Sequence, residues 1–340
     1  MPRIAYLGPP GTFSEEALLT QRDLDAERVP VASIPEVIAA VEHGDADLGV
    51  VPIENSIEGP VTVTLDHLAF ESELLIQREI DLPIRLNLCA RPGVAIADVA
   101  RVLSHPHAHA QCRDWMRSKL PDARIETVNS TAEAARLTAR SRRRDQAAVG
   151  TAFAAELYRL DVLAAGIEDH ADNMTRFVLV GDGIPAPTGH DKTSIVCFQR
   201  HDRPGSLLAI LQEFAARAVN LTKLESRPTK RSLGDYCFFI DFEGHLADEV
   251  VADCLRSLAG KQARVKFLGS YPVAGEEEAR ARRRAASRAW RQATAWVDDL
   301  RRRVRQPGEP FDTSGRPAPS AGPDPATSPT PSTAPVRELP

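Results

Sequence analysis

The first 183 residues alternate short apolar runs with segments of helical periodicity. Apolar runs predict strands at Ile4–Leu7, Asp47–Ile53, Ala147–Gly150 and Arg176–Val180. Between them, apolar positions at helical spacing predict helices over Ser14–Gln21, Ile34–His43, Ala108–Lys119, Thr131–Ser141 and Thr151–Tyr158. Strands that alternate with helices predict an α/β fold with a parallel or mixed sheet, in which ligands bind at the carboxyl ends of strands.

The element order changes from about residue 192. The pattern predicts strands at Thr193–Gln199, Leu221–Glu225, Tyr236–Phe242 and Arg264–Leu268, with helices at Ser206–Arg217 and Asp248–Leu258. That order is βαββαβ, a ferredoxin-like unit. The topology by itself names no function.

The composition changes again after Pro272. Residues 276–305 hold ten arginines against five acidic residues, a net charge of +5, and Trp290, Val297, Leu300 and Val304 fall on one stripe, so a basic amphipathic helix is predicted. Residues 306–340 carry ten of the 26 prolines and a net charge of −2, which predicts a disordered Pro-rich tail. Residues 1–275 therefore carry a net charge of −8, although the net charge of the whole chain is only −5. We expect the basic helix to pack on this acidic body or on a second copy of the chain. Nucleic-acid binding is the weaker hypothesis, since no recognised nucleic-acid-binding motif accompanies the arginines.

Hydropathy and cysteine usage limit the classes of protein. No apolar run approaches the roughly 18–20 residues that span a bilayer, and the N-terminus lacks a signal-peptide pattern, so membrane and secreted proteins are excluded. The five cysteines are widely spaced without a Cys-x-x-Cys pair, which argues against a disulfide framework or a zinc cage. We expect a cytoplasmic protein whose cysteines are mostly small core residues.

Two loops that follow predicted strands carry candidate polar groups. Gly8–Ser14 (GPPGTFS) fits a helix cap, because Thr12 and Glu15 have capping-box spacing, and equally an anion site of backbone amides and hydroxyls at a helix N-terminus. In Val50–Pro60, a buried strand runs into Glu54, Asn55 and Ser56. This loop fits a polar crevice at the end of a strand, or an Asx turn.

Two further segments place polar groups beside apolar strands. In Ser104–Cys112 (SHPHAHAQC), three histidines invite a metal interpretation, but no distant ligand set matches them, and a turn that caps the next helix is favoured. In Asn173–Val180 (NMTRFVLV), an arginine could grip a carboxylate bidentately while a threonine hydroxyl serves a leaving group. The alternative is a surface ion pair for Arg176 and strand propensity for Thr175.

These four segments, in this order, make residues 3–183 resemble prephenate dehydratases. The segments KTSIVCFQRHDRPGSLLAIL, NLTKLESRP and GDYCFFIDFEGH make residues 193–271 resemble the ACT regulatory domain that follows this enzyme. The resemblance covers about residues 1–271 and leaves out the tail. It implies a two-lobed catalytic domain similar to type II periplasmic binding proteins, with one lobe of about residues 1–77 plus 175–183 and another of 78–174.

The resemblance implies the decarboxylating dehydration of prephenate to phenylpyruvate, water and CO2, a lyase reaction of L-phenylalanine biosynthesis that needs no cofactor or metal. Thr175 is the implied catalytic residue, and we expect Thr175→Ala to lower turnover and Arg176→Leu to weaken substrate binding. Implied substrate-binding residues are Thr12, Phe13, Ser14, Asn55, Ser56, Ser104, His105, Gln111, Arg176 and Phe177. The family's common glutamine is His107 here, which leaves Gln111 as the safer amide.

The ACT resemblance implies feedback by L-phenylalanine as an allosteric effector. The implied effector residues are Arg203, Pro204, Gly205, Ser206, Leu207, Asn220, Leu221, Glu225, Ser226, Arg227 and Pro228. Such sites usually lie between subunits, so a homodimer or homotetramer is expected. Two alternatives stay open: an arogenate dehydratase, and a phenylalanine-binding regulator without catalysis. The catalytic motifs begin within ten residues of Met1, so we expect no chorismate mutase domain.

Overall fold

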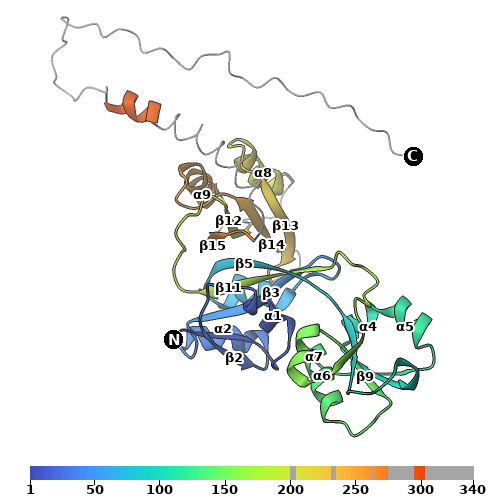
Figure 1. Cartoon of the computed structure of the whole chain (residues 1–340). Helices are drawn as coiled ribbons and strands as arrows, with labels where there is room; N and C mark the ends of the chain where they lie inside the picture. The colour runs from blue at the N-terminus through green and yellow to red at the C-terminus, as the bar shows by residue number, and fades with distance from the viewer. Residues whose placement is uncertain (200–203, 231–234, 262–263, 275–294, 303–340) are drawn as a thin grey trace, which may run out of the picture. The chain divides into compact units, whose positions relative to one another are not determined.

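The computed structural model describes residues 1–199, 204–230, 235–261, 264–274 and 295–302. The chain divides into two units, residues 1–287 and residues 288–340. The first unit holds three β-sheets and the helices that cover them (Figure 1). Within the described parts of the chain, no helix is long and apolar enough to cross a lipid bilayer.

The first lobe is built on a sheet that collects strands distant in the sequence. Its order is β2-β1-β3-β11-β5, with the short β4 beside β3. Strand β1 runs parallel to β2 and β3, whereas β11 is antiparallel to both of its neighbours. The strands are β1 (Arg3–Leu7), β2 (Glu27–Val31), β3 (Leu48–Asn55), β4 (Gly59–Pro60), β5 (Leu75–Pro83) and β11 (Met174–Gly181). The helices are α1 (Phe13–Leu19), α2 (Ile34–Glu42), α3 (Thr62–Asp66) and the π-helical turn η1 (His67–Glu71).

The second lobe is built on a sheet of order β10-β6-β9-β7-β8. Its strands are β6 (Asn87–Ala90), β7 (Arg101–Ser104), β8 (Arg124–Thr127), β9 (Gln146–Gly150) and β10 (Asp161–Ala164). Its helices are η2 (Ile96–Asp98), α4 (Pro106–Ala110), α5 (Arg113–Lys119), α6 (Thr131–Arg140) and α7 (Ala152–Tyr158). The chain therefore crosses between the lobes twice, after β5 and before β11.

Helix starts and a shared core fix the two lobes. Side-chain oxygens of Ser33, Ser130 and Thr151 accept the backbone N–H three residues later, and so cap α2, α6 and α7. One apolar cluster contains buried residues of both lobes, among them Tyr6 of the first and Val102 of the second. Because this cluster is continuous, the two lobes are held in one arrangement by buried apolar contacts.

A third sheet forms the βαββαβ unit, in the order β13-β14-β12-β15. Its strands are β12 (Asp191–Phe198), β13 (Leu221–Pro228), β14 (Tyr236–Glu243) and β15 (Arg264–Pro272), and its helices are α8 (Ser206–Ala215) and α9 (Glu249–Lys261). One face of the sheet packs against α8 and α9, in a cluster that includes Phe214 and Phe242. The other face packs on the first lobe, where Phe239 and Tyr271 share a cluster with Val178. The sheet therefore separates its own helices from the strands of the first lobe (Figure 1).

The contact between the third sheet and the first lobe is close where β15 meets β5. Gly269 has a φ of +143°, and a Cβ added there would lie 2.6 Å from the carbonyl oxygen of Ile76. Only glycine combines this backbone conformation with so short an approach. The two backbones are therefore in direct contact at this point.

The structure differs from the predicted elements in two places that affect the site. The helix predicted over Ala108–Lys119 is divided into α4 and α5, because Cys112 takes a non-helical φ of −119° and the Gln111 carbonyl accepts a hydrogen bond from the backbone N–H of Asp169. The lobe boundary expected at residue 78 falls inside β5, which stays in the first sheet to its end. The mixed sequence of β5 hid this strand, whose place is decided by pairing with β11.

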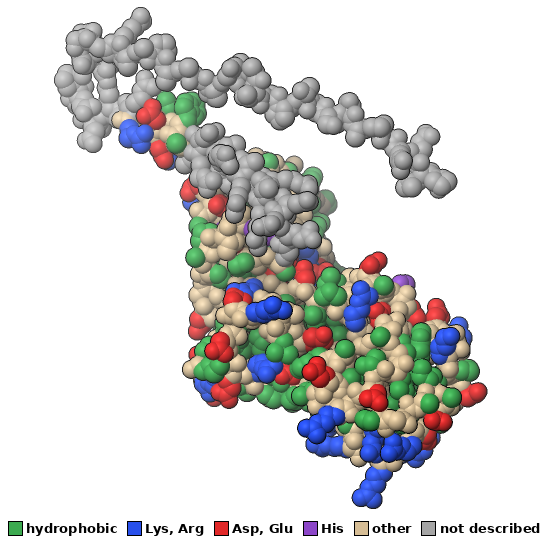
Figure 2. Space-filling view, viewed as in Figure 1, with side chains coloured by type: hydrophobic (Ala, Val, Ile, Leu, Met, Phe, Trp, Pro, Cys, Tyr) green, Lys and Arg blue, Asp and Glu red, His purple; other side chains and the backbone are tan. Residues whose placement is uncertain are grey.

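The second unit is described only over residues 295–302, which are helical and leave Trp296, Val297 and Leu300 more than one-third exposed. The rest of the predicted basic helix of 276–305 and the predicted tail of 306–340 lie outside the described residues. In the space-filling view, acidic and basic side chains are interspersed over the first lobe, and Lys and Arg gather at the lower edge of the second (Figure 2). The acidic excess of the body is therefore not one continuous patch on this face.

Candidate active site

A hydrogen bond between two paired strands lies at the centre of the candidate site. Thr175 of β11 is directly opposite Asn55 of β3 in the antiparallel register, and Asn55 Nδ2 donates to Thr175 Oγ1 at 2.8 Å. The other end of the amide is fixed, since Asn55 Oδ1 accepts the backbone N–H groups of Ile57 at 3.0 Å and Glu58 at 2.9 Å. The predicted Asx turn is therefore present, and its amide also reaches Thr175. With its oxygen acting as an acceptor, Thr175 can donate its own proton to a bound molecule.

Asn173 connects this pair to the second lobe. Its Oδ1 accepts from Asn55 Nδ2 at 2.8 Å, and its Nδ2 donates to Gln111 Oε1 at 3.0 Å. Ser56 Oγ accepts the backbone N–H of Met174 at 2.9 Å, which ties the loop after β3 to the start of β11. Asn173 is not among the predicted site residues, although it stands two residues before Thr175 in the segment Asn173–Val180.

Glu58 extends the polar contacts further into the second lobe. Gln111 Nε2 donates to Glu58 Oε1 at 3.1 Å, and His107 Nδ1 lies 3.0 Å from Glu58 Oε2. The hydrogen bond from Gln111, followed by the contact with His107, holds the pKa of the Glu58 carboxyl below its usual range despite some burial. The histidine that departs from the family pattern thus pairs with a carboxylate of the opposite lobe.

The remaining residues of the histidine segment lie beside this contact. Ser104 ends β7, is fully buried and donates to the backbone carbonyl of His105 at 3.1 Å. His105 occupies the N-cap position of α4 and stacks on His107 with ring centroids 5.3 Å apart. Burial, followed by the nearby His107, lowers the pKa of His105, which favours its neutral form. Among the described residues, no group of three or more His, Cys, Asp or Glu side chains has the geometry of a metal site.

The glycine loop before α1 lies where the two lobes meet. Thr12 caps α1: its Oγ1 donates to the Leu7 carbonyl at 2.7 Å and accepts the backbone N–H of Glu15 at 3.5 Å. Tyr158 of the second lobe donates its hydroxyl to the Pro10 carbonyl at 2.6 Å. Gly11 has a φ of +95° and packs so closely that a Cβ would lie 3.3 Å from Tyr158. The structure thus uses the Thr12 hydroxyl for capping, and Phe13 and Ser14 begin the helix.

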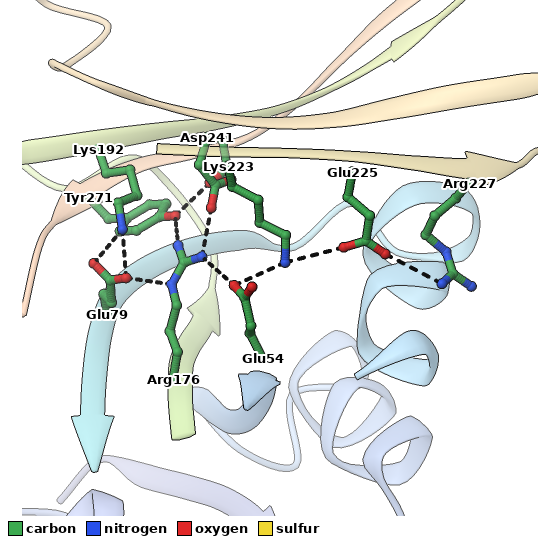
Figure 3. Close-up of polar contacts among 10 residues, drawn as sticks. Glu54, Glu79, Arg176, Lys192, Lys223, Glu225, Arg227, Asp241 and Tyr271 are labelled. Carbon is green, nitrogen blue, oxygen red and sulfur yellow. Dashed lines mark hydrogen bonds and ion pairs between the residues drawn. The ribbon is translucent and has the colours of Figure 1, made fainter. Parts of the chain in front are cut away.

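Two predicted substrate-binding residues are placed elsewhere. Phe177 is 2% exposed and belongs to the apolar cluster shared by the lobes, so it is a core residue. Arg176 follows Thr175 on β11 and therefore points to the opposite face of the sheet. There its Nη1 lies 2.6 Å from Asp241 Oδ2 and its Nη2 donates to Tyr271 Oη at 2.9 Å (Figure 3). This placement corrects the expectation that Arg176 binds a substrate carboxylate, because its guanidinium is already paired with Asp241 and Tyr271 on the face of the sheet opposite Thr175.

The surroundings of Arg176 keep it charged. Its side chain is 11% exposed, and Glu79 lies against its Nε. Burial acts to lower the pKa of the guanidinium, but Tyr271, Asp241 and Glu79 outweigh burial and raise that pKa above its ordinary value. Arg176 is therefore part of a buried ionic contact between the first lobe and the βαββαβ unit.

A second candidate site is a cavity of about 460 Å³ in the βαββαβ unit. It is lined by Gln199, Gly205, Ser206, Leu207, Leu208, Leu211, Ser226, Tyr236 and Phe238. Four of the predicted effector residues, Gly205, Ser206, Leu207 and Ser226, are among them. Leu208, Leu211, Tyr236 and Phe238 were not predicted, although the helical spacing of Leu207, Leu208 and Leu211 placed them near the start of one helix.

The other predicted effector residues do not line this cavity. Glu225 and Arg227 alternate with Ser226 along β13 and point toward the first lobe, where Arg227 Nη2 lies 2.9 Å from Asp66 Oδ1. This orientation corrects the expectation that both side chains hold the effector, because successive residues of a strand face opposite sides. Pro204, Asn220, Leu221 and Pro228 are described but are not among the lining residues, and Arg203 lies outside the described residues.

Comparison with known proteins identifies the family. The family model "Prephenate dehydratase" matches residues 4–184, and the "ACT domain" model matches residues 193–260. A prephenate dehydratase of Mycolicibacterium gilvum is 46% identical over 317 residues, which cover 88% of this chain and 99% of the relative. The structure of a prephenate dehydratase from Arthrobacter aurescens in complex with L-Phe has a TM-score of 0.76 and 41% identity, over 88% of this chain and 99% of that one.

The similarity also extends to a chain described by a different activity. GqqA, described as a novel type of quorum-quenching acylase, has a TM-score of 0.70 and 30% identity, over 80% of this chain and 98% of that one. A shared fold does not decide between activities, so the residues of the site carry the functional argument. The predicted α/β fold with a ferredoxin-like unit and the predicted resemblance are both confirmed. By family model and by full-length similarity, this chain belongs to the prephenate dehydratase family and carries a C-terminal ACT domain.

Proposed function

We propose that this chain is a lyase that converts prephenate to phenylpyruvate, water and CO2, with Thr175 as the group that serves the leaving oxygen. The observation that carries the proposal is the 2.8 Å hydrogen bond from Asn55 Nδ2 to Thr175 Oγ1. A threonine hydroxyl is a weak acid by itself. An amide donor on its oxygen polarises it and directs its proton toward the crevice.

The reaction breaks two bonds to the same ring, the bond to the carboxylate and the C4–O bond. As the bond between the ring and the carboxylate breaks, its electron pair forms a new ring double bond and CO2 leaves. The C4–O bond breaks at the far end of the ring, and the departing hydroxide takes a proton that Thr175 relays from solvent, so that water leaves and the threonine hydroxyl is regenerated. Thr175 hydrogen-bonds to that oxygen as negative charge develops on it, which lowers the barrier. Aromatisation of the ring drives the step, and no electrons are exchanged with an outside acceptor, so no cofactor enters the proposal.

Neutral side chains of the crevice are suited to the carboxylate that leaves. Asn55, Asn173 and Gln111 supply amide groups, and Ser56 supplies a hydroxyl near them. A carboxylate that becomes CO2 loses its charge, so a strong cation beside it would stabilise the ground state more than the transition state. The withdrawal of Arg176 from the crevice fits this requirement. We propose Asn173 as a further residue that orients both Asn55 and Gln111.

L-Phenylalanine is the proposed effector, and the ACT cavity is its proposed site. The volume of about 460 Å³, the apolar Leu207, Leu211 and Phe238, and the backbone at the start of α8 suit an amino acid with an aromatic side chain. The similar Arthrobacter aurescens enzyme was solved in complex with L-Phe. Next to this cavity, Leu208, Leu224 and Tyr236 are each exposed by more than two-fifths. We therefore propose that the ACT domains associate in a homodimer or homotetramer and cover these side chains.

The proposed location is the cytoplasm. All five cysteines are free and buried. Burial raises the pKa of the Cys89 and Cys112 thiols to about 12, which keeps them protonated and unreactive. Such thiols suit a reducing compartment.

One experiment tests activity, substrate and regulation together. The full chain is incubated with prephenate, with and without L-phenylalanine, and phenylpyruvate is followed by absorbance. Turnover of prephenate that changes with millimolar L-phenylalanine is the expected result.

A parallel reaction with arogenate tests the alternative substrate, and faster turnover of arogenate would replace the proposal. Binding of L-phenylalanine without turnover of either substrate would indicate a regulator without catalysis. Light scattering of the same sample gives the oligomeric state.

A further inference from the structure

Two dipeptides of the first sheet, Thr175-Arg176 on β11 and Glu54-Asn55 on β3, each place one side chain on either face of the sheet. In the register of β3 and β11, Thr175 is opposite Asn55, and Arg176 is opposite Glu54. Thr175 and Asn55 meet in the crevice, whereas Arg176 Nη1 lies 3.6 Å from Glu54 Oε2 on the face toward the ACT domain (Figure 3). Adjacent side chains of a strand alternate between faces. A movement of Arg176 or Glu54 on the ACT side would therefore also move the adjacent Thr175 or Asn55 on the other face of the sheet.

Arg176 is held by both domains at once. Asp241 of β14 and Tyr271 of β15 contact it from the ACT sheet, and Glu79 of β5 contacts it from the first lobe. Asp241 is oriented in turn by Ser194, whose Oγ donates to Asp241 Oδ1 at 2.6 Å. Burial raises the pKa of Asp241, but the charge of Arg176, the hydrogen bond from Ser194 and the charge of Lys192 together outweigh burial and keep that pKa below its usual value. The charged side chain beside Thr175 thus depends on the position of the ACT sheet.

Strand β13 continues these contacts toward the effector cavity. Lys223 Nζ lies 3.0 Å from Glu54 Oε2 and 3.3 Å from Glu225 Oε2, and Glu225 Oε1 lies 3.6 Å from Arg227 Nη1. We call Arg176, Glu54, Lys223, Glu225 and Arg227 the interdomain ion-pair chain (Figure 3). On the opposite face of the same strand, Ser226 lines the cavity. One strand therefore separates the proposed effector from the interdomain ion-pair chain.

Burial makes these pairs sensitive to small displacements. The side chains of Lys223, Glu225 and Arg227 are between 10% and 17% exposed, whereas Glu54 at the end of the link is 37% exposed. A charge that loses its partner in such surroundings is costly, so the strands move together rather than let a pair separate. At the other side of the interface, the backbones of Gly269 and Ile76 are in direct contact, so the sheet and β5 cannot approach each other more closely there. The pair of Lys223 with Glu54 is the contact through which a shift of β13 would reach β3.

We propose that the interdomain ion-pair chain couples occupation of the ACT cavity to the crevice, with Lys223–Glu54 as the link and with Arg176 and Glu54 as positioning residues for Thr175 and Asn55. The proposal rests on the proposed function, since it needs an effector in the cavity and turnover in the crevice. Lys223 neither lines the ACT cavity nor belongs to the candidate active site. A substitution of Lys223 therefore tests the coupling separately from effector binding and from catalysis.

The test compares wild type with Lys223→Met, which removes the charge and keeps the length of the side chain. Binding of L-phenylalanine is measured by calorimetry, and prephenate turnover is measured with and without saturating L-phenylalanine. An allosteric effect is typically on the order of 5–150-fold. In Lys223→Met we expect the effect to fall to about twofold or less, with L-phenylalanine affinity and basal kcat within about threefold of wild type.

Two further variants make the result specific. Lys261→Met removes a cation that pairs with Glu213 inside the ACT domain, and we expect it to keep the full L-phenylalanine effect. Glu54→Gln breaks the same link from the other side. The double variant should therefore lose no more coupling than Lys223→Met alone.

The outcomes are distinguishable from a failure of the proposed function. If wild type shows no effect of L-phenylalanine, both the proposed regulation and the coupling fail. If wild type responds and Lys223→Met responds equally, the proposed function stands and the inference is overturned. Equal loss of coupling in Lys261→Met would also overturn it, because the effect would then come from general loosening of the ACT domain.

Discussion

The two faces of the first sheet differ in the chemistry of their side chains. The face that carries Thr175 presents amides and hydroxyls, and Asn55 donates hydrogen bonds to both Asn173 and Thr175. The ACT-facing side, made by adjacent residues of the same strands, presents buried charges around Arg176. Neutral donors suit a reaction in which a carboxylate loses its charge, whereas paired charges fix two domains in one register. One pair of strands can therefore serve catalysis on one face and domain attachment on the other.

The largest effect is expected from loss of the threonine hydroxyl. Thr175→Ala should lower kcat by about 10²–10⁴-fold, the usual contribution of a positioned proton donor, with a much smaller change in KM. Thr175→Ser, which keeps the hydroxyl, should retain most of the activity. Steady-state formation of phenylpyruvate measures both variants. An unchanged kcat in the alanine variant would remove Thr175 from the mechanism.

The charged face should respond in stability. Arg176→Leu leaves the buried Asp241 without its cation, while Glu79 keeps Lys192, and should destabilise the chain by about 3–5 kcal/mol in urea unfolding. The matched control is Arg78→Leu on β5, whose guanidinium pairs with the exposed Asp23 and is expected to contribute at most about 1 kcal/mol. Equal losses in the two variants would contradict the contrast between the faces.

The neutral face can be tested by introducing a charge at one atom. Asn55→Asp keeps the oxygen that accepts from Ile57 and Glu58 but replaces the donor to Thr175 by a carboxylate oxygen. We expect kcat to fall by about 10²-fold, as when one aligned donor is removed from an active site. Asn129→Asp, on an exposed loop residue, is the matched control and should be silent. A normal kcat in Asn55→Asp would show that Thr175 needs no polarising donor.

The smallest effect is expected from the contact of Glu58 with Gln111 and His107. Because the pKa of Glu58 is depressed in the folded chain, its contribution to stability is present above the unfolded pKa and is lost as the pH falls through the folded pKa. Glu58→Gln should therefore flatten the acid side of the thermal-unfolding profile, by less than about 1 kcal/mol for so open a contact. Identical profiles for the variant and wild type would exclude a contribution from this contact.

Periodicity predicted most of the helices, the four strands of the ACT domain and strands β1, β3, β9 and β11 to within a few residues, but it missed the buried strands β6 and β7. Strands such as β5 and β8 were missed because their mixed sequences acquire an apolar face only when paired. The segments around Asn55, Gln111 and Thr175 were recognised from the sequence, and the structure joins them through Asn173. This residue escaped notice because its importance lies in two contacts with distant residues, at 2.8 and 3.0 Å.

By itself, the sequence determined the family, the order of the domains and the segments that build each site, since these follow from residue types along the chain. Only the tertiary structure decided which way each side chain points. Arg176, Glu225 and Arg227 belong to segments recognised as ligand-binding, yet they face the interface between the domains. A strand alternates its side chains between two faces, and the face that becomes a crevice is chosen by what packs on the other. Here the ACT sheet packs on one face of β3 and β11, and so leaves Thr175 and Asn55 to the crevice.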